Sequence, residues 1–306
     1  MVKEAKITPH GMQVGNLELI WAVNSKDFFF SNSLFIDDTE AMVVDPSANF
    51  SYLEHLASSK RVSQVLNTHF HIDHRSLNHL FKDARFLCHK KDLRALLSLD
   101  NYLKLAGKEK NNEYVLWLQK IFSALNLGQA HVDETLLDQQ TLPLKDSEVR
   151  VVHLPGHTPG HIGLHFMDLD LLFVSDVDLT PLGPWYAGTT SNIDQFLASL
   201  QKIKTFHCRY YASSHGSRLY EPETFFEKLQ RFEDAFRIRD EKLLEALQES
   251  PKSLEELAQI GIIYRKVWLK KDPLKQSFEK QMLEKHLQRL EKAGQVHWEE
   301  GQWNKA

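Results

Sequence analysis

Ligand-type side chains are concentrated in residues 67–74, which read NTHFHIDH. Three imidazoles and one carboxylate fall within six consecutive positions there, a donor set that suits zinc, iron or manganese. If the segment leaves a strand in extended form, His69 and His71 point to the same side and can share one cation. Asp73 and His74 lie beyond the strand end and are free to turn toward a second cation. The stretch therefore predicts a metal site.

Three later segments place further ligand-type residues just past predicted strands. His157 lies in the tight turn PGHTPGH after an apolar run, Asp176 follows the apolar run 171–174, and His215 precedes Gly216 after a short strand. The first cluster follows an apolar, β-branched run in the same way. Strand ends on one edge of a sheet converge on one cavity, so we expect these residues to meet.

Strand and helix patterns alternate over the first two-thirds of the chain. Short β-type runs lie within residues 17–44, and helical spacing follows over 50–59, 75–82 and 91–99. This alternation favours an α/β sandwich. An inserted helical segment, residues 100–128, carries one apolar stripe, for which packing in the core is favoured over a lid above a site. The stripe consists of Val115, Leu118, Phe122 and Leu125.

Long amphipathic helices replace this alternation in the last third of the chain. The pattern predicts three helices and then a two-stranded hairpin, over residues 222–249, 253–259, 276–292 and 294–303. Three helices and a hairpin form a small module that resembles a winged helix. We therefore expect two domains, a larger one at 1–220 and a winged-helix-like C-terminal domain at 221–306.

Composition bounds the class of protein. The chain has 306 residues and a formal net charge of −4, and no part is strongly basic, so charge alone does not indicate nucleic-acid binding. Two cysteines, Cys88 and Cys208, provide no disulfide framework, and the N-terminus lacks the apolar core of a signal peptide. No apolar run approaches the roughly 20 residues that span a bilayer. We expect a soluble, cytoplasmic protein without membrane contact.

The ligand-type residues resemble, in order and spacing, the motifs of the metallo-β-lactamase-fold hydrolase superfamily. The resemblance covers about residues 14–218 and implies an αββα sandwich, followed here by the small helical, winged-helix-like domain. It also implies that Asp176 bridges two metal ions. Asp176 is preferred to Asp178 for this role because it directly follows an apolar strand and Ser175. The other implied ligands are His69, His71 and His157 on one ion and Asp73, His74 and His215 on the other.

A dinuclear centre has a defined chemistry. Two cations about 3.5 to 4 Å apart can share a water, lower its pKa and offset charge that develops on a substrate oxygen. A metal-bound hydroxide would attack the substrate, with Asp73 as proton acceptor, and the excess positive charge favours anionic substrates. The Tyr186 hydroxyl is a candidate donor to a substrate oxygen, with a packed aromatic loop as an equal alternative. We expect Asp45 and His161 to hold ligand rings in orientation.

The ligand types select among branches of the superfamily. Neither cysteine lies at a ligand position, which argues against the commonest zinc β-lactamases. Flavodiiron oxygen reductases carry glutamate where His71 stands. The full His and Asp set resembles glyoxalase-II-like thioesterases and lactonases, while a mononuclear-iron persulfide dioxygenase stays open. We expect two divalent ions, with zinc favoured over iron or manganese, and hydrolysis of a small ester, thioester or lactone.

The C-terminal pattern adds an alternative function. It resembles the winged-helix module of β-lactamase-like proteins, some of which are endoribonucleases. Cationic side chains that could meet phosphates gather at Arg265, Lys266, Lys270, Lys271 and Lys275. Because Asp272 interrupts them and the module is neutral overall, packing or a homodimer contact is favoured over RNA. A metal-dependent endoribonuclease or phosphodiesterase is the main alternative, and a non-enzymatic regulator with a metal-filled sensor domain is the least favoured.

Overall fold

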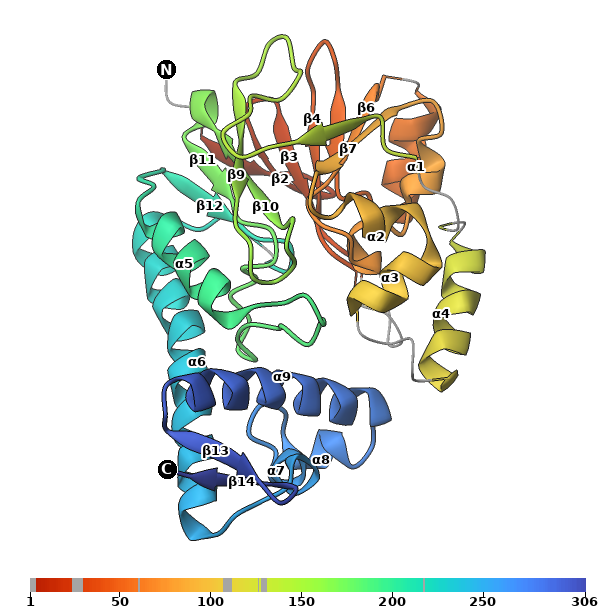
Figure 1. Cartoon of the computed structure of the whole chain (residues 1–306). Coiled ribbons are helices and arrows are strands. Elements are labelled where there is room, and N and C mark those ends of the chain that lie inside the picture. The colour runs from red at the N-terminus through yellow and green to blue at the C-terminus, as the bar shows by residue number, and fades with distance from the viewer. Residues whose placement is uncertain are drawn as a thin grey trace.

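Two β-sheets lie face to face, with helices on the outer face of each (Figure 1). The computed structural model describes residues 4–23, 30–59, 61–106, 112–125, 127, 131–216 and 218–306. The first sheet has its strands in chain order: β1 (Ala5–Ile7), β2 (Gly11–Val14), β3 (Leu17–Ile20), β4 (Ser33–Ile36), β5 (Met42–Val44), β6 (Gln64–Asn67), β7 (Arg85–His89) and β8 (Glu134–Leu136). The second has the order β12 (Tyr210–Ala212), β11 (Leu171–Phe173), β10 (Ile162–Phe166) and β9 (Val149–His153). This confirms the predicted αββα fold.

Strand direction in the first sheet changes at β5. Neighbours from β1 to β5 are antiparallel, and those from β5 to β8 are parallel. In the parallel part Val43 lies opposite Val65, and Asn67 lies opposite Cys88. The loop of residues 68–74 therefore begins at the carboxyl edge of this sheet. In the second sheet β9, β10 and β11 are antiparallel, and β12 is parallel to β11.

Alternating side chains divide each central strand between two cores. In β4, Leu34 and Ile36 belong to the core between the sheets, whereas Phe35 packs in the cluster that includes Leu53 of α1 (Phe50–Ser58). Both faces of the strand are therefore buried, which explains why such strands read as continuous apolar runs. On the second sheet the outer core includes side chains of α5 (Ile193–Lys204).

The inserted segment forms α2 (Leu93–Leu97), α3 (Leu99–Ala106) and α4 (Asn112–Ala124). Its predicted apolar stripe joins the same hydrophobic cluster as Phe70 and Ile72 of the 68–74 loop. Positions 107–111, 126 and 128 of the predicted segment lie outside the described residues. The stripe is therefore part of a core, and this core supports the loop that carries the first ligand-type cluster.

The predicted helix at residues 75–82 is wrong. The chain there makes short 3-10 turns instead, η1 (Ile72–His74) and η2 (Asn78–Leu80). The reason is a pair of side-chain hydrogen bonds between Asn67 and Asn78, whose amides bond to each other at 2.8 and 3.2 Å. This exchange ties the turn back to the end of β6, a long-range contact that helical periodicity does not report. A further 3-10 turn, η3, spans Met167–Leu169.

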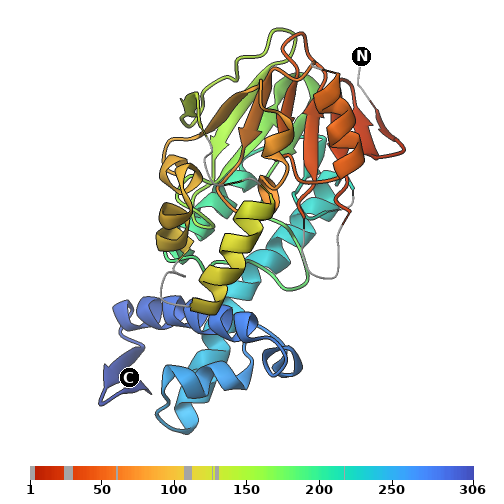
Figure 2. The same ribbon diagram turned by 90° about the vertical axis from the view of Figure 1, so that its right-hand side faces the viewer.

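Helices dominate the C-terminal region (Figure 1). They are α6 (Pro222–Glu249), α7 (Leu254–Ile260), α8 (Lys266–Leu269) and α9 (Pro273–Lys292), followed by the hairpin of β13 (Val296–Glu299) and β14 (Gln302–Lys305). The first half of α6 packs in the core outside the second sheet, and its second half packs with α7, α9 and the hairpin. Figure 2 shows α6 running from the sandwich to the C-terminal helices. The boundary at residues 220 and 221 and the winged-helix assignment stay predictions. None of the helices in the described ranges has the length and apolar character that crossing a bilayer demands.

A buried carboxylate joins the C-terminal helices. Glu279 of α9 is 0% exposed and accepts hydrogen bonds from the backbone N–H groups of Ile262 (2.8 Å), Ile263 (3.0 Å) and Tyr264 (2.8 Å). These donors lie in the turn between α7 and α8, so a single side chain connects that turn to α9. Burial raises the pKa of Glu279, while the three hydrogen bonds act in the opposite direction.

We expect Glu279→Ala to lower the free energy of unfolding by about 3 kcal/mol, because three backbone N–H groups, two of them buried, lose their acceptor at about 1 to 3 kcal/mol for each buried group. Glu279→Gln should cost less, since its amide oxygen can still accept. Urea unfolding followed by circular dichroism measures both values. Glu284→Ala, on the exposed face of the same helix, is the matched control and should change stability by less than about 0.5 kcal/mol. Equal losses in the two alanine variants would contradict this role of Glu279.

Candidate metal centre

Four loops bring the predicted ligands together. The loops follow β6, β9, β11 and β12, so each ligand lies just past a strand end. The β6 loop contributes four residues and each other loop one, namely His69, His71, Asp73 and His74, then His157, Asp176 and His215. The structure thus assembles, from both sheets, all seven residues that the sequence proposes as ligands.

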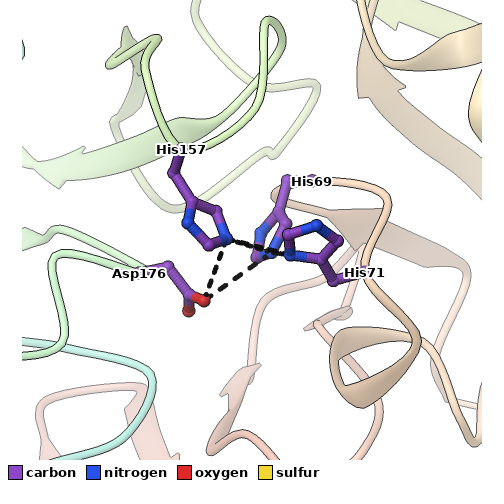
Figure 3. A group of neighbouring side chains, drawn as sticks. All are labelled: His69, His71, His157 and Asp176. Atoms are coloured by element: carbon purple, nitrogen blue, oxygen red, sulfur yellow. Dashed lines mark hydrogen bonds and ion pairs between the residues drawn. The ribbon is translucent and has the colours of Figure 1, made fainter. Parts of the chain in front are cut away.

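The first group consists of three imidazoles and one carboxylate (Figure 3). Nδ1 of His71 lies 3.0 Å from Nε2 of His69 and 2.9 Å from Nε2 of His157. Oδ2 of Asp176 is 3.2 Å from Nε2 of His157 and 3.8 Å from Nε2 of His69. All three rings are buried. Donor atoms from three loops therefore face one small space.

The second group shares Asp176 with the first. Oδ2 of Asp73 lies 3.6 Å from Nε2 of His74 and 3.6 Å from Nε2 of His215. Oδ1 of Asp176 lies 2.9 Å from Nε2 of His74 and 3.5 Å from Nε2 of His215. The two carboxylate oxygens of Asp176 thus face different groups, Oδ2 the first and Oδ1 the second.

Buried polar atoms test whether this donor set fits cations. Within the described part of the chain, Nε2 of His74 and Oδ1 of Asp176 are buried and make no hydrogen bond. They are close together, but the contact lacks the angles that a hydrogen bond requires. Buried polar atoms without partners are costly in a folded protein, and a divalent cation would satisfy both. The residues therefore fit metal ions, and each group could hold one.

Burial and neighbouring charges distinguish the two groups. Burial lowers the pKa of His69 and of His71 well below the usual value, so both rings are neutral and carry free lone pairs. Burial also acts to lower the pKa of His74, but nearby carboxylates, Asp176 first, outweigh it and hold that pKa well above the usual value. In the same way Asp176 raises the pKa of His215 to about 9. Without cations the second group holds protons that the first does not.

Hydrogen bonds behind the ligands fix their orientation. Asp45, which is 0% exposed, bonds to Nδ1 of His74 at 2.8 Å and accepts from Thr68 N–H at 2.7 Å. His161 donates from Nδ1 to the Leu154 carbonyl oxygen at 2.8 Å, and its Nε2 accepts the backbone N–H of Asp176 at 3.0 Å. Asp45 therefore orients a ligand ring as expected, whereas His161 orients the backbone of Asp176.

Asp92 is a functional residue that sequence reasoning missed. It is buried, and it accepts hydrogen bonds from Thr158 Oγ1 and Gly160 N–H, each at 2.6 Å, in the turn that carries His157. A Cβ at Gly160 would stand 2.6 Å from the Asp92 carboxyl group, so only glycine fits there. Burial raises the pKa of Asp92 to about 6. Asp92 lies just past β7, and the strand-end signal that indicated the ligands could have identified it.

The structure does not bring Tyr186 to the ligand cluster. Its side chain is 0% exposed, and its hydroxyl bonds to Nε2 of His286 at 2.5 Å and accepts from Arg239 at 2.7 Å. The expectation that this hydroxyl donates to substrate does not fit this geometry, whereas the packed-loop alternative does. The neighbouring Trp185 lies at the cluster instead, with its ring 5.3 Å from that of His71.

Asp178, the competitor for the bridging position, is engaged within its own loop. Its carboxylate accepts from the backbone N–H of Thr180 at 3.1 Å and from the Thr180 hydroxyl at 3.3 Å. Burial raises the pKa of Asp178 to about 6. The structure therefore gives Asp178 a turn-stabilising contact and places Asp176 between the ligand groups.

The sequence was compared with models of known protein families. A sequence model described as the metallo-beta-lactamase superfamily matches residues 27–215, more than half of the chain. The chain belongs to the metallo-beta-lactamase superfamily. The matched range includes all seven members of the two ligand groups.

Several curated members of the superfamily are similar in sequence. Atrochrysone carboxyl ACP thioesterase of Aspergillus fumigatus is 25% identical over 219 residues, which cover 68% of this chain and 56% of that protein. Acyl-coenzyme A thioesterase MBLAC2 of Homo sapiens is 30% identical over 39% of this chain and 43% of its own length. Hydroxyacylglutathione hydrolase of Pelagibacter ubique is 24% identical over 74% of this chain and 83% of its own length. This chain thus spans about half the length of the first two relatives.

Solved structures in the superfamily share the fold over nearly the whole chain. A metallo-beta-lactamase family protein from Thermus thermophilus matches with a TM-score of 0.70 at 20% identity, covering 95% of this chain and 99% of that one. A beta-lactamase domain protein from Burkholderia ambifaria matches with a TM-score of 0.71 at 17% identity, covering 95% and 91%. Because 95% coverage extends beyond the sandwich, the similarity in fold includes C-terminal helices.

We expect an ion to release more protons when it binds the second group than when it binds the first. A cation entering the second group must displace the ring proton of His215, whose pKa is about 9, and that of His74, whose pKa is also raised. Its apparent affinity should therefore rise about tenfold per pH unit for each proton displaced between pH 7 and 9. The rings of His69 and His71 are already neutral in that range and have no ionising proton to release, so affinity at the first group should change little. Calorimetric titration in buffers of different ionisation enthalpy counts the released protons.

A His215→Asn variant is the control for this titration. It should reduce the number of protons released with the second ion and leave the first ion unaffected. Equal proton release with both ions would contradict the electrostatic difference between the groups.

Proposed function

We propose that this chain is a metal-dependent thioester hydrolase in which each ligand group holds one divalent ion. The observation that carries the dinuclear proposal is the position of Asp176, whose two oxygens face separate groups of imidazoles. A carboxylate in this position would bridge two ions and hold them at a fixed separation. We propose zinc, because imidazole and carboxylate donors without cysteine suit it, although the same donors accept iron or manganese.

The names of the relatives support a thioester as the substrate. Two are thioesterases, one for an acyl carrier protein and one for acyl-coenzyme A, and a third hydrolyses hydroxyacylglutathione. All three names describe an acyl group on a thiol carrier. Hydrolysis of such a substrate breaks the carbon–sulfur bond and yields a carboxylate and a thiol.

The exposed ligands indicate where the substrate enters. Asp73 and His215 have side chains that are 28% and 20% exposed, whereas His69 and His74 are 0% exposed. The cluster therefore opens on the side of Asp73 and His215. Bound divalent ions would supply a water of lowered pKa and polarise the substrate carbonyl. Asp73, at the opening, is placed to accept the proton of the attacking water and return it to the departing sulfur.

The surrounding residues keep the ligand nitrogens ready for ions. Asp45 holds a proton at Nδ1 of His74, and the Trp185 carbonyl oxygen holds one at Nδ1 of His157, 2.9 Å away. With Nδ1 of each ring protonated, Nε2 is the atom that can bind an ion. At His74, whose pKa is held well above the usual value, the proton on Nε2 must leave first, but neither ring has to turn when ions bind.

Cleavage of single-stranded RNA is a second candidate, supported by one surface feature. Trp268 of α8 is 42% exposed, and the guanidinium of Arg265 lies over its ring, 5.4 Å from the centroid. Exposed Lys266 and Lys270 flank this pair. An aromatic ring among cations suits stacking of a base beside its phosphate.

The decisive experiment combines metal content with three assays. We expect about two zinc ions per chain of wild-type protein, with hydrolysis of an acyl thioester in preference to a lactone or single-stranded RNA. Asp176→Ala should lose bound metal, and its kcat/KM should fall by about a hundredfold or more, because the bridging carboxylate serves both ions.

Asp83→Asn is the control, because it removes an exposed carboxylate just before β7, at the end of the strand opposite the ligand loops. It should keep both metal content and activity. A protein with one iron and no hydrolysis would contradict the proposal and favour the mononuclear dioxygenase. Salt-sensitive RNA cleavage without thioester hydrolysis would favour the second candidate.

A further inference from the structure

The loop of residues 181–188 lies between the ligand cluster and the C-terminal helices. Trp185 in this loop contacts both sides, since its ring packs edge-on against His71 at 5.3 Å and against Phe278 of α9 at 5.3 Å. Its carbonyl oxygen accepts the Nδ1–H of His157 at 2.9 Å. The direction of the His157 ring therefore depends on where the backbone at Trp185 is held.

One guanidinium of α6 holds that backbone. Arg239 is 4% exposed and donates to the carbonyl oxygens of Leu182 (2.6 Å) and Pro184 (2.8 Å) and to the hydroxyl of Tyr186 (2.7 Å). The three acceptors flank Trp185 on both sides. A planar arginine fork can serve several acceptors in a fixed arrangement, which the single ammonium group of lysine cannot match.

The loop lies directly on α6 at Gly183. This residue has a φ of +78°, which glycine adopts without strain. A Cβ there would stand 2.9 Å from the Cβ of Ala235 and 3.3 Å from Nη2 of Arg239. Any side chain would push the loop away from the helix, so Gly183 and Arg239 together set the distance between them.

A buried chain of hydrogen bonds holds Arg239 in place. The carboxylate of Asp240 accepts from Nδ1–H of His286 at 2.7 Å and also from Arg289. Nε2 of His286 is then the acceptor, so the Tyr186 hydroxyl donates to it, and the Tyr186 oxygen accepts from Arg239. From Arg239 through Tyr186 and His286 each group donates to the next, and Asp240 ends the chain as an acceptor. The α6 and α9 helices thus fix the loop through polar contacts with defined geometry.

We propose that Arg239 is a positioning residue for the first ligand group. By fixing residues 182–186 it places the Trp185 carbonyl, and this carbonyl sets the ring of His157 toward His69 and His71. The inference rests on the proposed function only in that this group holds an ion. Within the described part of the chain, no hydrogen bond joins this loop to the second group, so the effect is confined to one ion.

The test is Arg239→Met, which removes the donors and keeps much of the side-chain volume. Affinity for each ion is measured by competition between the protein and a chelator, with cobalt(II) as a visible probe. We expect one ion to bind about tenfold more weakly, the lower end of the effect of residues behind metal ligands, and the other ion to be unchanged. Arg239→Lys should restore part of the loss, because its ammonium group can still donate to one or two carbonyl oxygens.

Two double variants show which ligand group depends on Arg239. In a His215→Ala background, which leaves the first group intact, Arg239→Met should still weaken binding about tenfold. In a His71→Ala background, which disables the first group, Arg239→Met should have no effect on the ion that is left. The reverse pattern would overturn the proposal.

Leu257→Ala controls for a merely structural role. Leu257 is buried in the core of the C-terminal helices and does not touch the loop, so its loss should lower the melting temperature without changing either affinity. If Leu257→Ala weakens the same ion, or if Arg239→Met binds both ions as wild type does, the inference fails while the proposed function stands. Wild-type protein that binds no pair of ions would reject the proposed function itself. If Arg239→Met does not fold, Tyr186→Phe provides the test, because it removes only one hydroxyl from the chain of hydrogen bonds. It should weaken binding of the same ion by a smaller factor, and unchanged binding would reject the proposal.

Discussion

The placement of the Asp176 carboxylate between two sets of imidazoles is the constraint on which the structure depends. Burial by itself raises the pKa of this carboxyl group, yet the imidazoles of His74 and His215 hold that pKa well below its usual range. A buried charge and several ring nitrogens can stay together only in rigid surroundings. The loops that carry them follow strands of two different sheets, and the close-packed core between the sheets fixes their separation. The packing of the two sheets therefore keeps the ligand-type side chains at short distances from one another.

The contacts behind the ligands make the two groups electrostatically different. His157 is backed by a main-chain carbonyl, that of Trp185, whereas His74 is backed by the carboxylate of Asp45. The second group also has a carboxylate of its own, Asp73, besides its share of Asp176. Negative charge thus accumulates at the second group, and neutral donors prevail at the first. Two ions of one element would meet different environments, one of them at the opening of the cluster and closer to an arriving substrate.

Sequence reasoning succeeded where the signal is local. Each of the seven ligand-type residues lies within a few residues of an apolar strand, so strand-end position and residue type predicted that they meet. The alternation of strands and helices predicted an α/β sandwich, and the resemblance to the superfamily supplied its αββα layering. It failed where contacts join distant segments. Asp92 bonds to Thr158 across 66 positions, and Tyr186 bonds to His286 across 100. The turn at residues 75–82 read as a helix because its fixing contact with Asn67 is side chain to side chain, which periodicity does not encode.

The polar contacts between the loop and the C-terminal helices bear on what those helices are for. Attachment alone needs only apolar packing, and α6 already supplies it through Phe225, Leu229 and Phe232. Burying charged groups such as those of Arg239 and Asp240 costs desolvation free energy that apolar side chains would not incur. Unlike apolar packing, their hydrogen bonds form only when the partner atoms lie at defined positions, so such groups fix the orientation of what they bind. Because this network reaches the residues on either side of Trp185, holding the loop in one position would account for its cost. The change in composition near residue 220 therefore does not mark a break in the structure, since α6 packs in both parts and its Arg239 bonds to the loop that contacts the ligand cluster.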